Sequence, residues 1–282
     1  MMRGTNFVGS NSLVAKLAFI ILVIFVFVIL LKVGTTLLGY LFSPSINPVL
    51  IDGMVDGSVL KVISVDPNKP KSVPILRSNN QNDGLVFTWS MWLYINQPQF
   101  NNKFCPNNNC SPDAATWSHI FSKGSELPNS IGIMEPNNGP GVYISNDYRR
   151  IGVIMNGYET NNNSGNDMVV IEDIPIEHWI CLIIRLDQHR LDVFFNGVLA
   201  KSIILYDVPK QNYENVYIGL NGGFQGYISE LQYFGYLLGA NKIQEILNSG
   251  PNLKDLNQNL NNKIANYLSF RWYFPEQAAE MQ

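Results

Sequence analysis

Apolar and polar residues alternate along several short segments in the second half of the chain. In the segment 191–195, LDVFF, the first, third and fifth residues are apolar and share one face of a strand, because successive side chains of a strand point to opposite faces. The pair Asn196-Gly197 follows, and it favours a two-residue type I′ turn, since both turn positions need positive φ. The segment 173–247 therefore predicts a β-hairpin within a longer series of strands.

Aromatic residues occupy both faces of the strand predicted for 87–95, FTWSMWLYI. One face would lie in the core of a sandwich, and the other, which carries Trp92, would be partly covered by a loop or a ligand. An early strand is predicted in VLKVISV, and the late YLSFRWYF is expected to return beside an early strand. A short helix is predicted for ANKIQEILNS, which ends at the stop signal Gly250-Pro251.

A continuous apolar run of fifteen residues, Leu17–Leu31, lies between Lys16 and Lys32. As a helix it would be about 22 Å long, and the apolar residues beyond Lys32 supply the length that a hydrocarbon core of about 30 Å needs. We predict an uncleaved signal anchor over 13–42, with a cleaved signal peptide and a buried core helix as the alternatives. The basic residues beside the run favour a cytoplasmic N-terminus and a translocated C-terminal domain.

Charge is distributed unevenly along the chain. All 22 acidic residues lie beyond position 50, together with 16 of the 19 basic residues, so this part carries a formal charge of −6. Such a surface has no electrostatic attraction for nucleic acid phosphates. The charge therefore argues against nucleic-acid binding.

Four stretches carry a resemblance to a known fold. They are FTWSMWLYI, WSHIFSKG, IPIEHWICLIIRLDQHRLDVFFNGVLAKS and GFQGYISELQYFGYLLGANKIQEI, which cover most of residues 85 to 247. Their order of strand, Asn-Gly hairpin, Gly-x-Ile strand and short helix resembles the laminin-G-like branch of the concanavalin A-like superfamily. The resemblance implies an all-β fold, an antiparallel jelly-roll sandwich, preceded here by one N-terminal transmembrane helix.

Three flanking motifs add a second resemblance. RSNNQ (77–81), GPNLK (250–254) and YLSFRWYF (267–274) resemble membrane-anchored versions encoded by large DNA viruses of algae and protists. The chain also departs from the family pattern, because many relatives carry an acidic residue where this chain has Ser229. We therefore carry over no calcium site, and no cofactor is implied.

These observations divide the chain into five predicted parts. The parts are an N-terminal tail (1–12), the transmembrane signal anchor (13–42), a juxtamembrane linker with an early strand (43–84), the laminin-G-like jelly roll (85–247) and a C-terminal extension with a final strand (248–282).

The acidic and histidine residues form no pattern typical of an enzyme. Hydrolysis of a glycosidic bond needs two carboxylates that flank it. The densest acidic cluster, Glu172, Asp173 and Glu177, is interrupted by Pro175 and is divided between both faces of its segment. The three histidines are scattered, without metal-like partners. We predict a protein without catalytic or metal-binding residues, and glycoside hydrolysis stays open as an alternative.

The cysteines point to one small covalent loop. Cys105 and Cys110 bracket PNNN, and a disulfide between them is predicted on the translocated side, where the alternatives are free thiols or a zinc half-site. Cys181 lies within the apolar WICLII and is expected to be a core residue.

The anchor, the strand pattern and the missing carboxylate pair together favour a membrane-displayed module that binds a glycan or a protein at a cell or virion surface. Sugars stack on aromatic faces and form hydrogen bonds with amides, so four residues are candidate ligand-binding residues: Trp92, Tyr148, Tyr158 and Asn221. The alternative is that they only pack or decorate loops. A second hypothesis is a structural virion protein that links a membrane to a capsid.

Overall fold

The computed structural model describes residues 13–77, 85–97, 116–158 and 167–256. It forms two units, 1–44 and 45–282.

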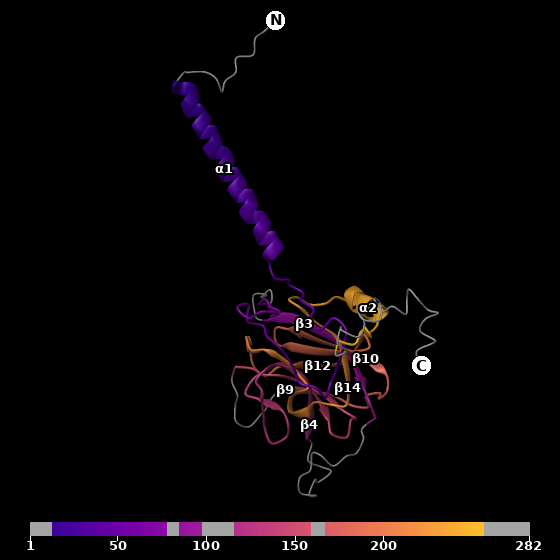
Figure 1. Ribbon diagram of the computed structural model, residues 1–282. Helices are drawn as coiled ribbons and strands as arrows, with labels where there is room; N and C mark the ends of the chain where they lie inside the picture. The colour runs from indigo at the N-terminus through magenta and orange to yellow at the C-terminus, as the bar shows by residue number, and fades with distance from the viewer. Residues whose placement is uncertain (1–12, 78–84, 98–115, 159–166, 257–282) are drawn as a thin grey trace, which may run out of the picture. The chain divides into compact units, whose positions relative to one another are not determined.

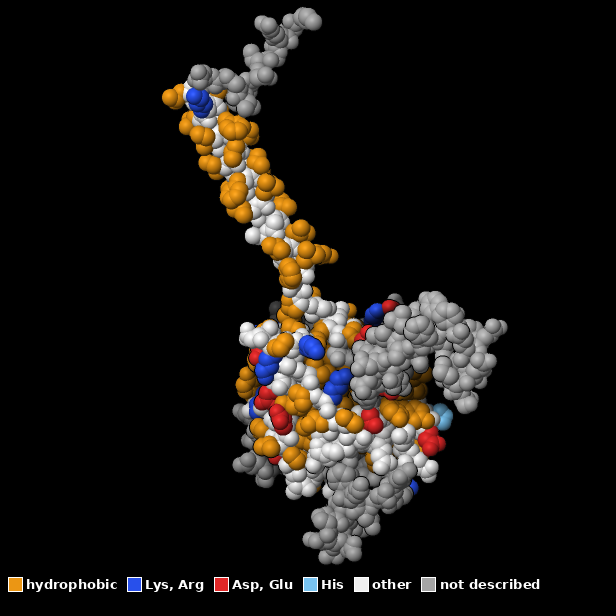
Figure 2. Space-filling view, in the orientation of Figure 1, with side chains coloured by type: hydrophobic (Ala, Val, Ile, Leu, Met, Phe, Trp, Pro, Cys, Tyr) orange, Lys and Arg blue, Asp and Glu red, His pale blue; other side chains and the backbone are white. Residues whose placement is uncertain are grey.

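The described residues of the first unit form one helix, α1 (Leu13–Phe42) (Figure 1). Its 30 residues span about 45 Å. By length and composition the helix can cross a membrane. Figure 2 shows apolar side chains along its visible length. A signal sequence would meet the same test, so the structure establishes an apolar helix that fits either role.

The second unit is a sandwich of two six-stranded antiparallel sheets (Figure 1), which confirms the predicted all-β class. The first sheet has the order β1 (Met54–Asp56), β14 (Gly226–Phe234), β3 (Val86–Ile95), β10 (Trp179–Asp187), β11 (Arg190–Phe195), β12 (Val198–Ile204). The second has the order β2 (Lys61–Ile63), β13 (Val216–Ile218), β4 (Trp117–Gly124), β7 (Asn138–Ser145), β8 (Ile151–Met155), β9 (Asp167–Ile171). A small separate pair joins β5 (Leu127–Pro128) to β6 (Met134–Glu135).

The main core lies between the two sheets. The Trp89 ring of β3 packs against the Phe121 ring of β4, with 4.9 Å between ring centroids. Trp92 points to the other face of β3, where helix α2 (Ala240–Ser249) covers it with Ile243. The two aromatic faces of β3 are therefore both buried, and a helix contributes to the cover of the second face, where we expected a loop or a ligand.

The predicted hairpin is present between β11 and β12. Asn196 and Gly197 both have positive φ, 48° and 79°, as a type I′ turn requires. The Asn196 side chain also binds the neighbouring strand β10, because its Oδ1 accepts a hydrogen bond from the Cys181 N–H at 2.9 Å. Cys181 is fully buried, as expected, and burial raises the pKa of its thiol to about 12.

The segment after α1 belongs to the sandwich and is not a free linker over its whole length. Residues 46–56 run along β14, and β1 and β2 add a strand to each sheet. The predicted disulfide pair Cys105 and Cys110 lies outside the described residues, as does the predicted final strand 267–274.

Candidate functional site

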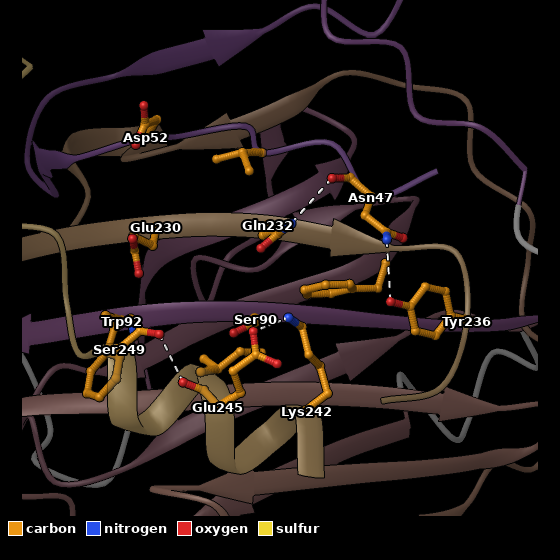
Figure 3. A pocket seen from close by; sticks show the side chains of 13 residues that line it. Asn47, Asp52, Ser90, Trp92, Glu230, Gln232, Tyr236, Lys242, Glu245 and Ser249 are labelled. Carbon is orange, nitrogen blue, oxygen red and sulfur yellow. Dashed lines mark hydrogen bonds and ion pairs between the residues drawn. The ribbon is translucent and has the colours of Figure 1, made fainter. Parts of the chain in front are cut away.

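A cleft of about 340 Å³ lies on the outer face of the first sheet, beside helix α2 (Figure 3). Four segments line it, namely 47–52, β3, β14 with Tyr236, and α2. Its volume is within the usual range for small-molecule sites. The cleft therefore combines segments that are far apart in the sequence.

Residues 46–53 form one wall because they pair with β14. The Leu50 N–H donates to the Leu231 carbonyl at 2.8 Å, and the Tyr233 N–H donates to the Pro48 carbonyl at 3.1 Å. Leu50 and Ile51 are buried, which holds the segment against the core. Its polar residues Asn47 and Asp52 consequently face the cleft, although they follow α1 by only a few residues.

A bulge in β14 places Glu230 at the cleft. The register with β3 shifts between Ser229 and Gln232, and Glu230 has a φ of 51°, in the left-handed region. Bulges redirect side chains in this way and are frequent near functional sites. The Glu230 N–H donates to the Gly53 carbonyl at 3.2 Å, which joins the bulge to the wall that carries Asp52.

Two buried polar atoms at the cleft have no hydrogen-bond partner among the described residues. They are the indole Nε1 of Trp92 and the Oδ1 of Asn47. Trp92 is only 7% exposed. A buried donor or acceptor without a partner costs roughly 1–3 kcal/mol. One donor and one acceptor beside the cleft thus have unmet hydrogen-bonding capacity.

The lining carries three carboxylates and one ammonium group. Lys242 Nζ donates to Glu245 Oε1 at 2.6 Å, so this ammonium is already paired within α2. Asp52 Oδ1 accepts a hydrogen bond from the Asn252 side-chain amide at 3.1 Å. Burial raises the pKa of Glu230, and the charge of Asp52 raises it further. In the described part of the chain no lysine or arginine pairs with Asp52 or Glu230.

Comparisons with known proteins find partial structural similarity only. No family model and no curated protein matches the sequence. The receptor-binding domain of botulinum neurotoxin D is 15% identical, with a TM-score of 0.45, over 72% of this chain and 48% of that one. The type G receptor-binding domain is 16% identical, with a TM-score of 0.41, over 70% and 46%.

A further similar structure bears the description "Cell entry of botulinum neurotoxin type C is dependent upon interaction with two ganglioside molecules". It is 13% identical, with a TM-score of 0.40, over 58% of this chain and 36% of that one. The chain thus spans less than half of each of these three proteins. Such similarity assigns this chain to no family, and the laminin-G-like and viral resemblances remain predictions.

The four predicted ligand-binding residues do not form one site. Trp92 lines the cleft, whereas Asn221 lines a separate hollow of about 160 Å³. Tyr148 lies in the turn between β7 and β8, where its hydroxyl accepts a hydrogen bond from the Gln225 N–H at 3.1 Å. Tyr158 is 68% exposed and lines neither hollow.

Sequence reasoning missed three cleft residues, Asn47, Asp52 and Glu230. The first two lie in the segment interpreted as a linker, and Glu230 lies in a stretch that was interpreted only as part of the fold. The cluster of Glu172, Asp173 and Glu177 is exposed before β10, away from the cleft.

His119 is buried, and both ring nitrogens contact groups of the fold. Its Nε2 is 2.8 Å from Ser122 Oγ, and its Nδ1 accepts a hydrogen bond from the Leu220 N–H at 3.2 Å. Burial lowers the pKa of His119 to about 3, so the ring is neutral at ordinary pH. Among the described residues, no group of three or more His, Cys, Asp or Glu could hold a metal ion.

Proposed function

We propose that this protein is a membrane-anchored saccharide-binding module and that the cleft beside α2 is its binding site. The observation that carries the proposal is the pair of buried, unpartnered atoms, Trp92 Nε1 and Asn47 Oδ1, at a cleft lined by polar groups. A sugar hydroxyl is both a donor and an acceptor, so the hydroxyls of a saccharide can supply partners of both kinds.

The other lining groups fit the same chemistry. Carboxylates and amides accept hydrogen bonds from hydroxyl groups, and Asp52, Glu230 and Gln232 provide such acceptors. Ser90 and Tyr236 add hydroxyls that donate or accept. An apolar ligand would leave these groups without partners, which makes a hydroxyl-rich ligand the better fit.

The helix over 13–42 supplies the membrane attachment in this proposal. We expect the N-terminus to be cytoplasmic and the sandwich to be displayed on the other side, at a cell surface or on a virion membrane. The sandwich would then meet glycans of that compartment.

Full-length protein in detergent micelles, applied to an array of oligosaccharides, tests the proposal. We expect saturable binding, and Trp92→Phe should weaken it by about fivefold, since loss of one buried hydrogen bond costs about 1 kcal/mol. Trp179→Phe is the matched control, because Trp179 lies on the neighbouring strand β10 but does not line the cleft. Absence of any saccharide binding would favour the structural, capsid-linking role. If both substitutions weakened binding equally, the cleft would not be the binding site.

A second candidate function is glycoside hydrolysis by the cleft. Asp52 and Glu230 both line it, and the raised pKa of Glu230 is a property of general acids in such enzymes. Incubation of bound oligosaccharides with the protein tests this candidate. If the wild type released products and Glu230→Gln did not, the cleft would be catalytic. If the oligosaccharides stayed intact, the result would support binding alone.

A further inference from the structure

We infer that the cleft selects saccharides that carry a protonated amino group, such as 2-amino-2-deoxy sugars, over N-acetylated or carboxylated sugars. This inference rests on the proposed function and specifies the ligand class of the same site. It follows from the charge of the lining and from the buried indole N–H of Trp92.

The negative charge of the cleft is not neutralised by the protein. Glu245 is paired with Lys242 within α2, whereas Asp52 and Glu230 have no basic partner among the described residues. Figure 3 shows Asp52 and Glu230 on adjacent segments at one part of the cleft. An ammonium group placed between them gains attraction from both, and a carboxylate or sulfate is repelled by both.

The backbone keeps these two carboxylates together despite their repulsion. The Glu230 N–H donates to the Gly53 carbonyl, directly after Asp52, and the bulge holds Glu230 at positive φ. Burial, and then the charge of Asp52, raises the pKa of Glu230, which is the direction expected when a carboxylate lacks a cation. A bound ammonium would supply that cation and favour the ionised form.

The buried indole N–H of Trp92 requires an acceptor, which an ammonium group alone does not provide. A lysine ammonium has donors only, so a lysine peptide would have to bring a separate backbone carbonyl to Trp92. An amino sugar brings the ammonium and hydroxyl oxygens on one rigid ring. It therefore offers an ammonium group to the carboxylates and oxygen acceptors to the Trp92 N–H.

Isothermal titration of the full-length protein in micelles tests the inference with three probes on related backbones. They are a short β-1,4-linked glucosamine oligomer, the same oligomer fully N-acetylated, and a short galacturonate oligomer. In mildly acidic buffer, at about pH 5.5, the galacturonate carboxylates are ionised and a sugar amine is largely protonated. We expect the glucosamine oligomer to bind about tenfold more tightly than the N-acetylated one, and the galacturonate oligomer most weakly.

A cleft variant and a control variant test whether the preference for amino sugars comes from the cleft. Glu230→Gln keeps the shape of the side chain and removes its charge, so the ratio of the two affinities, glucosamine oligomer over N-acetylated oligomer, should fall about threefold or more. Glu172→Gln is the control, since it makes the same change at an exposed residue outside the cleft.

Each outcome separates this inference from the proposed function. Equal binding of the glucosamine and N-acetylated oligomers would overturn the amino-sugar preference and leave saccharide binding intact. No binding of any of the three, and none on the wider array, would overturn both. A lysine tripeptide that binds as tightly as the glucosamine oligomer would overturn the inference in favour of a basic peptide ligand.

Discussion

At the scale of single residues, the most connected charge of the sandwich is Asp192 on β11. Its carboxylate is 3% exposed and accepts hydrogen bonds from Arg185 Nη2 at 2.7 Å and Ser202 Oγ at 2.6 Å. Burial alone would raise the pKa of Asp192, but the hydrogen bonds from Ser202 and Arg185 hold it below its ordinary value. The folded state therefore prefers the ionised carboxylate.

Asp192→Asn should lower the free energy of unfolding by about 2 kcal/mol, because it leaves Arg185 without its counter-charge. Asp187→Asn is the control, since its pair with Arg190 is more exposed and should contribute under about 1 kcal/mol. Urea unfolding near neutral pH measures both. Equal losses would contradict the central role of Asp192.

The same carboxylate predicts an acid dependence of stability. Its folded-state pKa is depressed, so its contribution is complete above the unfolded value of about 3.9 and is lost as the pH falls through the folded value. Urea midpoints measured from about pH 6 down to about pH 2 should fall less steeply in Asp192→Asn than in the wild type. Parallel curves would show that other carboxylates cause the acid loss.

Lys123 predicts a dependence in the alkaline range. It is 6% exposed, its Nζ donates to the Glu214 carbonyl at 2.8 Å, and burial lowers its pKa to about 8 although the Glu214 carboxylate raises it in part. Between about pH 8 and about pH 10, Lys123 is protonated in the unfolded chain but largely deprotonated in the folded protein. Stability should therefore rise with pH over this range. Lys123→Met should remove this rise in urea midpoints. A rise that persists in the variant would assign it to another group.

At the scale of elements, the Asn196-Gly197 turn of the hairpin packs against helix α2. Gly197 has a φ of 79°, and a Cβ there would lie 2.2 Å from the Leu247 side chain of α2. Gly197→Ala should therefore cost about 1–2 kcal/mol through the strained φ and a displaced Leu247. Gly239→Ala is the matched control, because Gly239 has a φ of −78° and open space around it. Thermal unfolding compares them, and equal melting temperatures would contradict this coupling.

The hairpin and the strand β3 could be predicted because their signals are local. A turn pair and a period of two are readable within a few residues. The cover over Trp92 was misjudged as a loop because the predicted helix gave no sign of which face it packs on. The bulge at Glu230 was missed for a related reason, since an alternating strand and a bulged strand have the same residue pattern.

At the scale of the whole molecule, the cleft could not be predicted because its walls meet only after folding. The segment that carries Asn47 and Asp52 pairs with β14, far away in the sequence, and no residue pattern in this short segment predicts such pairing. Trp92 was found because an aromatic residue on the second face of a core strand needs a cover. The sandwich class was therefore predictable from the sequence, whereas its candidate site was recovered only at one residue.

The apolar helix α1 predicts attachment of the whole chain to a membrane. Full-length protein should stay in the membrane fraction after alkaline carbonate extraction. Ile24→Arg combined with Phe27→Arg should release it, because each arginine at the centre of a membrane helix costs about 2.5–3.5 kcal/mol. Leu38→Arg combined with Leu41→Arg is the control, since arginines near a helix end extend to the interface and should leave the attachment intact. A mature chain that begins after residue 42 would instead identify a cleaved signal peptide, and the sandwich would then act as a released module.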